Sequence, residues 1–323
     1  MCIRDRFRRA AAIHRGRADR HGEAAALVDL GNLLCDTWRI AEAAEAHGRA
    51  ADLYHVVGDR HGEAIARNSL GLCLQRIPRL TDAVEAHTSA IEAFLDTGDR
   101  HGEGLARINL GMVLARAARP GEAVEQHERA VLLLRACADP HGEAVAQNHL
   151  GCALRRTEEF DRALAAHDRA AELFRQTRDR KSEADVLNNI GTCRRAMGQH
   201  ERAVATHAEA AAVYREVGDR HGEAEAAAKT VEALLETGRF EEAANAAALA
   251  VELVEGTGDR FGTAGAYTNL GAVLTELGRY EEAIGASGKA VLLFRELGCV
   301  AEEDNAMANL AVAERRGRRG RPV

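Results

Sequence analysis

One five-residue string returns through this chain at a fixed interval of 40 residues, and this interval constrains the fold more than any other feature. Asp-Arg-His-Gly-Glu or a variant of it stands at 19–23, 59–63, 99–103, 139–143, 179–183, 219–223 and 259–263. Self-similarity at one period is the signature of repeat proteins, in which each unit packs mainly against its neighbours. The sequence therefore predicts seven like units in a row.

Each unit reads as two helices. Asp59 and its counterparts can cap the first helix through their carboxylates, and Glu63 suits the positive end of its dipole. Apolar residues such as Leu70 and Leu74 then recur at helical spacing. We define the frame position as the residue number modulo 40. The second helix is expected over frame positions 1–17, and Gly58 and its equivalents are expected to end it.

Three columns of small residues predict close packing. Alanine fills frame position 3 at Ala43, Ala83, Ala123, Ala163, Ala203, Ala243 and Ala283. It fills frame position 10 at Ala50, Ala90, Ala130, Ala170, Ala210, Ala250 and Ala290. Glycine fills frame position 31 at Gly31, Gly71, Gly111, Gly151, Gly191 and Gly271. A glycine inside a helix costs about 1 kcal/mol relative to alanine, so a neighbouring helix is expected to approach too closely for a side chain.

Leu-Gly in the first helix followed by two alanines seven residues apart in the second resembles the tetratricopeptide repeat. The 40-residue period, with Gly-Asp-Arg-x-Gly-Glu and Asn-Leu-Gly, is similar to the longer Pins/LGN subtype of that family. The resemblance implies an all-α fold, a right-handed superhelical solenoid of antiparallel helix pairs. The unit 220–259 departs from the pattern, with Thr230 and Val231 in place of Leu-Gly.

The frame also predicts the division of the chain. Residues 18–299 hold the seven units, 300–316 a capping helix and 317–323 a basic disordered tail. Residues 7–17 fit the second half of a second helix, which suggests a fragment of a longer protein with its upstream domain missing. Residues 1–6 do not fit the frame and are interpreted as a non-native scar.

Composition excludes several classes of protein. No apolar run is long enough to span a membrane, and a net charge of −7 argues against nucleic-acid binding. The 7 cysteines form no Cys-x-x-Cys pair, so neither a disulfide framework nor a zinc site is expected, and a reducing cytoplasm is the default location. Only 3 of the 43 basic residues are lysines, which is typical of a GC-rich bacterial genome.

The 14 histidines mostly follow the repeat rather than one centre. Five stand at frame position 7, namely His47, His87, His127, His167 and His207. Five stand at frame position 21, namely His21, His61, His101, His141 and His221. We expect the first column to lie in the seam between repeats with its rings hydrogen-bonded to backbone. No phosphate loop, nucleophile elbow or His-Glu-x-x-His occurs, so neither an enzyme nor a metal or cofactor site is predicted.

The resemblance implies a concave groove lined by first helices, and the position before Leu-Gly faces it. Asparagine recurs there and one residue earlier, and arginine recurs near the ends of the middle first helices. The candidate groove residues are Asn68, Asn109, Asn148, Asn188, Asn189, Asn269, Asn309, Arg76, Arg116, Arg155, Arg156 and Arg195. Each set of residues has an alternative interpretation. The asparagines can form a ladder that only bonds neighbouring helices, and the arginines can be residues that only satisfy the ends of their helices.

The first interpretation of function is a peptide- or protein-binding scaffold, the C-terminal array of a larger bacterial signalling or regulatory protein. An alternative is an intracellular peptide-pheromone receptor. A third, a helical-repeat RNA reader, would need the basic surface that the net charge opposes.

Overall fold

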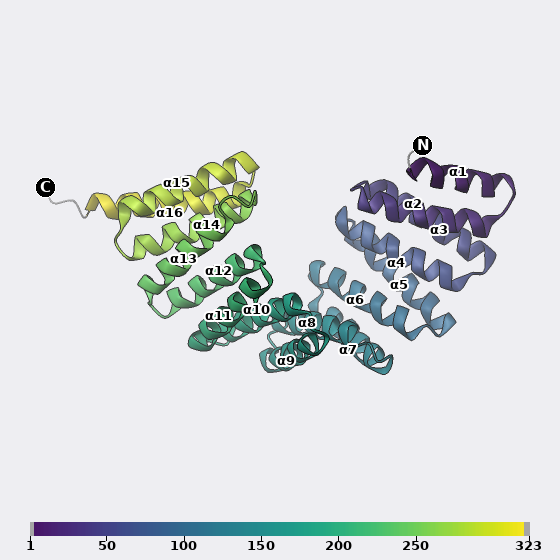
Figure 1. Ribbon diagram of the computed structural model, residues 1–323, viewed down its shortest axis with the longest axis horizontal. Coiled ribbons are helices and arrows are strands. Elements are labelled where there is room, and N and C mark those ends of the chain that lie inside the picture. The colour runs from purple at the N-terminus through teal and green to yellow at the C-terminus, as the bar shows by residue number, and fades with distance from the viewer. Residues whose placement is uncertain (1–2, 320–323) are drawn as a thin grey trace. The chain divides into compact units, whose positions relative to one another are not determined.

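The computed structural model describes residues 3–319, and these residues form sixteen α-helices and no strand. Two compact units divide the chain, residues 1–173 and 174–323, with the boundary inside α9. In each unit successive helices run antiparallel and pack against each other (Figure 1). The expected all-α array of helix pairs is thus confirmed within each unit.

The helices of the first unit follow the 40-residue frame. They are α1 (Ile3–Gly16), α2 (Arg20–Asp36), α3 (Ile40–Val57), α4 (Arg60–Arg76), α5 (Leu80–Thr97), α6 (Arg100–Arg116), α7 (Pro120–Ala136), α8 (Pro140–Arg156) and α9 (Phe160–Thr177). The first helices α4, α6 and α8 also contact one another in sequence. They therefore form a layer of their own.

The second unit repeats this arrangement. Its helices are α10 (Arg180–Ala196), α11 (His200–Val217), α12 (Arg220–Glu236), α13 (Phe240–Val254), α14 (Arg260–Glu276), α15 (Tyr280–Leu297) and α16 (Val300–Arg319). The first helices α10, α12, α14 and α16 contact one another in turn. We call the exposed surface of such a layer the first-helix face of its unit.

The helix ends mostly agree with the predicted caps. Each of the seven repeat aspartates accepts a hydrogen bond from the backbone N–H three residues on, at 2.8–3.1 Å. Gly58, Gly98, Gly218 and Gly298 end their helices in the left-handed conformation. The expectation for Gly258 is wrong, because α13 already ends at Val254 and both Gly256 and Gly258 have positive φ.

The first and last helices are longer than expected. Helix α1 begins at Ile3, so residues 3–6 continue the helix that the sequence placed at 7–17. Helix α16 continues to Arg319, three residues past the expected end at 316. A disordered tail is therefore wrong for residues 317–319, and residues 320–323 lie outside the described part of the chain.

The glycine column at frame position 31 is explained by the histidine column at frame position 7. In five repeats the imidazole ring of the second helix lies directly over the glycine of the first helix of the same repeat. A Cβ atom added to the glycine would stand 2.4–2.6 Å from the ring. All five rings are buried, 0–1% exposed, so they have no room to retreat. The expectation that the rings lie between repeats is corrected: they lie inside each repeat.

The two remaining repeats keep the same fit with different residues. In one, Val231 replaces the glycine and Ala247 replaces the histidine, and both are buried. In the other, Gly271 faces Ser287, whose Oγ would stand 2.2 Å from an added Cβ. In the first of these repeats a larger residue at the glycine position is matched by a smaller one at the histidine position. The pair Gly271–Ser287 keeps the close contact with smaller side chains.

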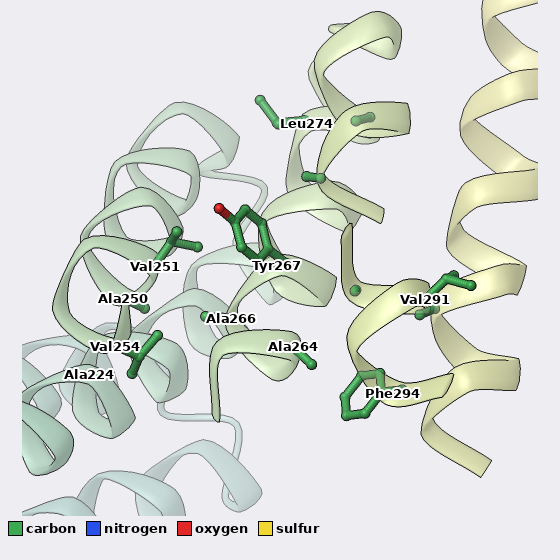
Figure 2. Close-up of a cluster of buried hydrophobic side chains, with 14 of the residues drawn as sticks. Ala224, Ala250, Val251, Val254, Ala264, Ala266, Tyr267, Leu274, Val291 and Phe294 are labelled. Atoms are coloured by element: carbon green, nitrogen blue, oxygen red, sulfur yellow. The ribbon is translucent and has the colours of Figure 1, made fainter. Parts of the chain in front are cut away.

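Alanine and aliphatic side chains complete the core. Every alanine at frame positions 3 and 10 is 0–2% exposed. In the second unit the buried cluster combines Val251 and Val254 of α13, Tyr267 of α14 and Phe294 of α15 (Figure 2). Because alanine has the smallest side chain apart from glycine, neighbouring helices within each unit can approach closely.

Buried carboxylates join each repeat to the next. The glutamate at frame position 23 is 2–7% exposed in all six repeats that have it. In four repeat junctions it pairs with an arginine at frame position 15 of the preceding second helix, as in Arg135–Glu143 at 2.9 Å and Arg215–Glu223 at 2.6 Å. A buried charge without a partner is costly, so these four pairs favour the register in which the glutamate meets its arginine. Glu103 instead pairs with Arg107 of its own helix at 2.7 Å.

The glycine–histidine fit predicts the outcome of a compensating exchange. Gly111→Val should destabilise the chain by about 1–3 kcal/mol, because the valine overlaps the buried ring of His127. Gly111→Val combined with His127→Ala recreates the native pair Val231–Ala247 and should recover stability. Urea denaturation followed by circular dichroism measures both. Gly121→Ala is the control, since a Cβ there meets nothing within 4 Å. Strict additivity of the two single changes would contradict the fit.

Candidate functional site

The asparagines at frame position 29 lie half-buried on the first helices. Asn109 is on α6, Asn189 on α10, Asn269 on α14 and Asn309 on α16. Asn109 donates to Oδ1 of Asn68 on the preceding first helix at 3.2 Å. Asn109 and Asn68 thus bridge two neighbouring first helices. This contact is of the kind expected for a ladder of asparagines, which was the alternative interpretation of the sequence.

The asparagines at frame position 28 are turned toward the paired helix. Oδ1 of Asn68 accepts from Nδ1 of His87 at 2.9 Å, and Oδ1 of Asn188 accepts from Nδ1 of His207 at 2.6 Å. Asn188 is only 5% exposed, so its prediction as a groove residue is wrong. The expected backbone partners of the buried rings are likewise wrong for these two histidines. Asn148, at the same frame position, is half-buried.

The predicted arginines are bound to neighbouring first helices. Arg116 donates to the carbonyl of Gln75 at 3.1 Å, and Arg156 donates to the carbonyl of Ala115 at 2.8 Å. The guanidinium of Arg76 stacks on the exposed ring of Trp38, 4.6 Å from its centroid. These contacts favour the alternative in which the arginines satisfy helix ends.

The last two predicted arginines differ from each other. Arg195 pairs with Glu232 at 3.0 Å and with Glu236 at 2.8 Å on the next first helix. Arg155 lies half-buried on α8. The predicted arginines therefore join neighbouring first helices as well as cover helix ends, as Arg116, Arg156 and Arg195 show.

An open cavity of about 510 Å³ lies on the first-helix face of the second unit. We call it the second-unit groove. Helices α12, α14 and α16 contribute most of its lining, and Val254 and Phe294 reach it from α13 and α15. Of the predicted groove residues it contains Asn269. Figure 2 shows the core side chains beneath it, among them Ala224, Ala266 and Phe294.

The groove combines a small-residue floor with a polar edge. The floor includes Ala224, Ala228, Gly265 and Ala266, and the polar lining includes Glu225, Asp259, Asn269, Glu302 and Asn305. Asp259 caps α14 and lies 3.2 Å from Nδ1 of His221. The charged groups other than this histidine are carboxylates, so the groove carries negative charge. Asn309 borders a separate cavity of about 620 Å³ next to Glu276 and Arg316.

Sequence analysis did not single out the apolar side chains of the first-helix face. Ile65 and Leu105 at frame position 25 and Leu72 at frame position 32 are 39–42% exposed, and Phe261 at the groove is 51% exposed. Ile65 and Leu72 are seven residues apart on α4 and therefore lie on one side of that helix. This spacing is the signal in the sequence that could have identified them.

The two histidine columns have different surroundings. Those at frame position 21 are exposed, and the rings of His21, His101 and His221 lie 3.0–3.2 Å from the cap aspartate of the next repeat. Those at frame position 7 are fully buried, and burial lowers the pKa of His87, His167 and His207 to about 4 and that of His127 to about 3. These rings are neutral at pH 7. His149 stacks on His127 with 5.6 Å between ring centroids.

One group of possible metal ligands departs from the sequence expectation. Cys35 and Cys73 are 38 residues apart in sequence, yet their Sγ atoms lie 3.2 Å apart. His47 completes a group whose ligand atoms all lie within 4.8 Å of one another. The sequence predicted no zinc site because the chain has no Cys-x-x-Cys pair, and that pattern does not detect two cysteines that meet from different helices. Within residues 3–319, no helix is both long and apolar enough to cross a membrane.

The stacked helix pairs and their first-helix face define a helical-repeat protein. Sequence models of the tetratricopeptide repeat match residues 97–176, 182–256 and 263–297. These ranges cover more than half of the chain, which therefore belongs to the tetratricopeptide repeat family. No curated protein matches the chain.

Solved structures with the same fold have little sequence in common with the chain. The apo form of RapI is 13% identical, with a TM-score of 0.63 over 92% of this chain and 100% of its own. A Rap protein complexed with Competence and Sporulation Factor is 12% identical, with a TM-score of 0.56 over 98% of both chains. A signal transduction ATPase with a tetratricopeptide repeat sensor, from Pyrococcus horikoshii, is 16% identical, with a TM-score of 0.63 over 90% of this chain and 43% of its own.

The buried histidines predict a loss of stability in acid. Their pKa in the folded chain lies below the unfolded value of about 6.5, so their contribution is complete above pH 6.5 and is lost as the pH falls toward 4. At pH 5 each such ring should lower the free energy of unfolding by about 1–2 kcal/mol relative to its value at pH 7. The urea concentration at the midpoint of unfolding should therefore decrease as the pH is lowered from 7 to 5. His87→Gln should make this decrease smaller. His61→Gln, at an exposed position, should leave the dependence of the midpoint on pH unchanged. An equal effect of both changes would refute the assignment of this dependence to the buried rings.

Proposed function

We propose that the chain is a scaffold that binds a peptide or a segment of another protein along its first-helix face. The observation that carries the proposal is the second-unit groove, a cavity of about 510 Å³ between three successive first helices. An apolar floor with a few polar groups at its edge allows a ligand to be both buried and oriented. The amide of Asn269 can donate to or accept from a peptide backbone.

The charge of the groove indicates the kind of ligand. Glu225, Asp259 and Glu302 stand around a floor of alanine and glycine. Small side chains leave room for the ligand, and the carboxylates attract a cation and repel an anion. We therefore propose a peptide that combines lysine or arginine with small apolar side chains.

The first unit offers a different surface. Ile65, Leu72 and Leu105 are exposed on its first helices, and Asn109 lies on the same face. Exposed apolar side chains gathered on one face of a soluble domain mark a binding surface more often than scattered ones do. We propose that the first unit contributes apolar contacts to binding, whereas the second unit contributes charge.

A receptor for a signalling ligand is the second candidate. It is favoured by the likeness in fold to the Rap protein complexed with Competence and Sporulation Factor, which covers nearly all of both chains. Such a receptor should contract when the ligand binds, so small-angle scattering distinguishes it from a scaffold whose radius of gyration stays constant. The likeness to the repeat sensor of the signal transduction ATPase supports a place in a larger signalling protein.

The groove can be filled without disturbing the fold, and this tests the proposal. A Cβ at Gly265 meets nothing within 4 Å, so Gly265→Leu should occupy the groove and leave the melting temperature unchanged or higher. Peptides selected from a random phage-displayed library on the full chain should bind Gly265→Leu at least about tenfold more weakly. Fluorescence anisotropy of a labelled selected peptide measures the affinity.

Gly285 provides a matched control, since it lies on the second helix α15 and its Cβ would also meet open space. Gly285→Leu should leave the affinity unchanged, and the selected peptides should be basic and bind more weakly at high salt. Peptides that bind Gly265→Leu as tightly as the wild type, or that are predominantly acidic, would overturn the proposal.

A further inference from the structure

A second site lies inside the first unit, away from the first-helix face. Cys35 of α2, His47 of α3 and Cys73 of α4 bring one ligand atom each to within 4.8 Å of one another. The two Sγ atoms are 3.2 Å apart. Two thiols and an imidazole are the ligand types that thiophilic metal ions prefer, and here they come from three different helices.

The group is largely buried. Cys73 and His47 are each 1% exposed, whereas Cys35 is half-buried. Leu34, Leu70 and Ile77 belong to the same hydrophobic core. A metal ion in such a place needs ligands that neutralise its charge, because a net charge is costly to bury.

The next repeat shows how the ring of His47 is oriented. There, Nε2 of His87 accepts from the amide of Gln75 at frame position 35, and Nδ1 donates to Asn68 at frame position 28. One repeat earlier, Cys35 stands at frame position 35 and Val28 at frame position 28. Nδ1 of His47 accordingly has no hydrogen-bond partner. By this equivalence, Nε2 of His47 directs its lone pair toward Cys35.

We propose that Cys35, His47 and Cys73 bind one Zn²⁺ ion. Two thiolates and a neutral imidazole cancel the charge of a dication, whereas they would leave a monovalent ion with a net negative charge. Zinc is usually four-coordinate, and the half-buried side of Cys35 leaves a position for water. Each thiol gives up its proton to solvent when the ion binds, so no oxidant or reductant is required.

A thiol that binds a metal ion releases its proton. Because the ligands belong to α2, α3 and α4, one ion would tie the helix pair of the first repeat to the first helix of the second. Binding to the folded chain alone raises its stability by mass action.

Zinc titration of the reduced full-length chain tests this proposal. After removal of metal with a chelator, the chain should bind one equivalent of Zn²⁺ in competition with a chromophoric indicator, and its melting temperature should rise. Cobalt(II) should give the visible bands of a tetrahedral ion and the thiolate charge-transfer band. Cys35→Ser, Cys73→Ser and His47→Asn should each weaken binding by at least about tenfold.

Cys193 offers a matched control because it occupies frame position 33, as Cys73 does, while the preceding repeat has Arg155 at frame position 35. Cys193→Ser should bind zinc as the wild type does. Circular dichroism of the metal-free variants checks that each is folded. Absence of stoichiometric binding, equal loss in Cys193→Ser, or zinc affinity that survives all three ligand changes would overturn the proposal. So would a Cys35–Cys73 disulfide that persists in reductant.

Discussion

In five repeats, the contact between a glycine on the first helix and an imidazole ring on the second helix limits how close together the two helices can lie. The ring occupies the place that a Cβ would take, at 2.4–2.6 Å, and is itself fully buried. Neither residue can change alone: a larger residue at the glycine collides with the ring, and a smaller residue at the histidine leaves a cavity. The pair Val231 and Ala247 satisfies the same steric limit with other residues, because a larger residue at the glycine position is combined with a smaller one at the histidine position.

Close pairing inside a repeat does not by itself place one repeat on the next. That is done by polar groups at the repeat junctions, where burial makes a misplaced partner costly. The glutamate at frame position 23 finds its arginine only in one register, and the cap aspartate accepts both from its own helix and from the side chain at frame position 21 of the preceding repeat, as Asp59 does from Gly62 and His21. Apolar packing therefore provides the stability of the stack, and the polar contacts fix its register.

The period and composition of the sequence were enough to predict the helix pairs, the aspartate caps and the buried alanine columns, because each is a local property repeated seven times. They were not enough to tell which neighbour fills a given space. Adjacent residues in a helix point about 100° apart, so Asn188 faces His207 while Asn189 stays on the first-helix face. The shortened α13 follows from Gly256, an extra glycine that the repeat frame hides. The Cys35–Cys73 contact depends on the register between two helices, which no local pattern reveals.

The difference between residues that pack against a partner and residues that do not explains where this chain can vary from repeat to repeat. Positions in the glycine–histidine contact and in the junctions are coupled to partners, so a change there needs a second change. Frame position 25 on the first-helix face varies more, with isoleucine, leucine, glutamate and glycine at residues 65, 105, 225 and 265. Free variation at these positions lets one backbone present an apolar surface in one unit and an acidic groove in the other. Frame position 35 shares features of both classes of position, because its side chain contacts the buried ring. In one repeat Gln75 donates a hydrogen bond to that ring, whereas in the repeat before it Cys35 stands there as a proposed metal ligand.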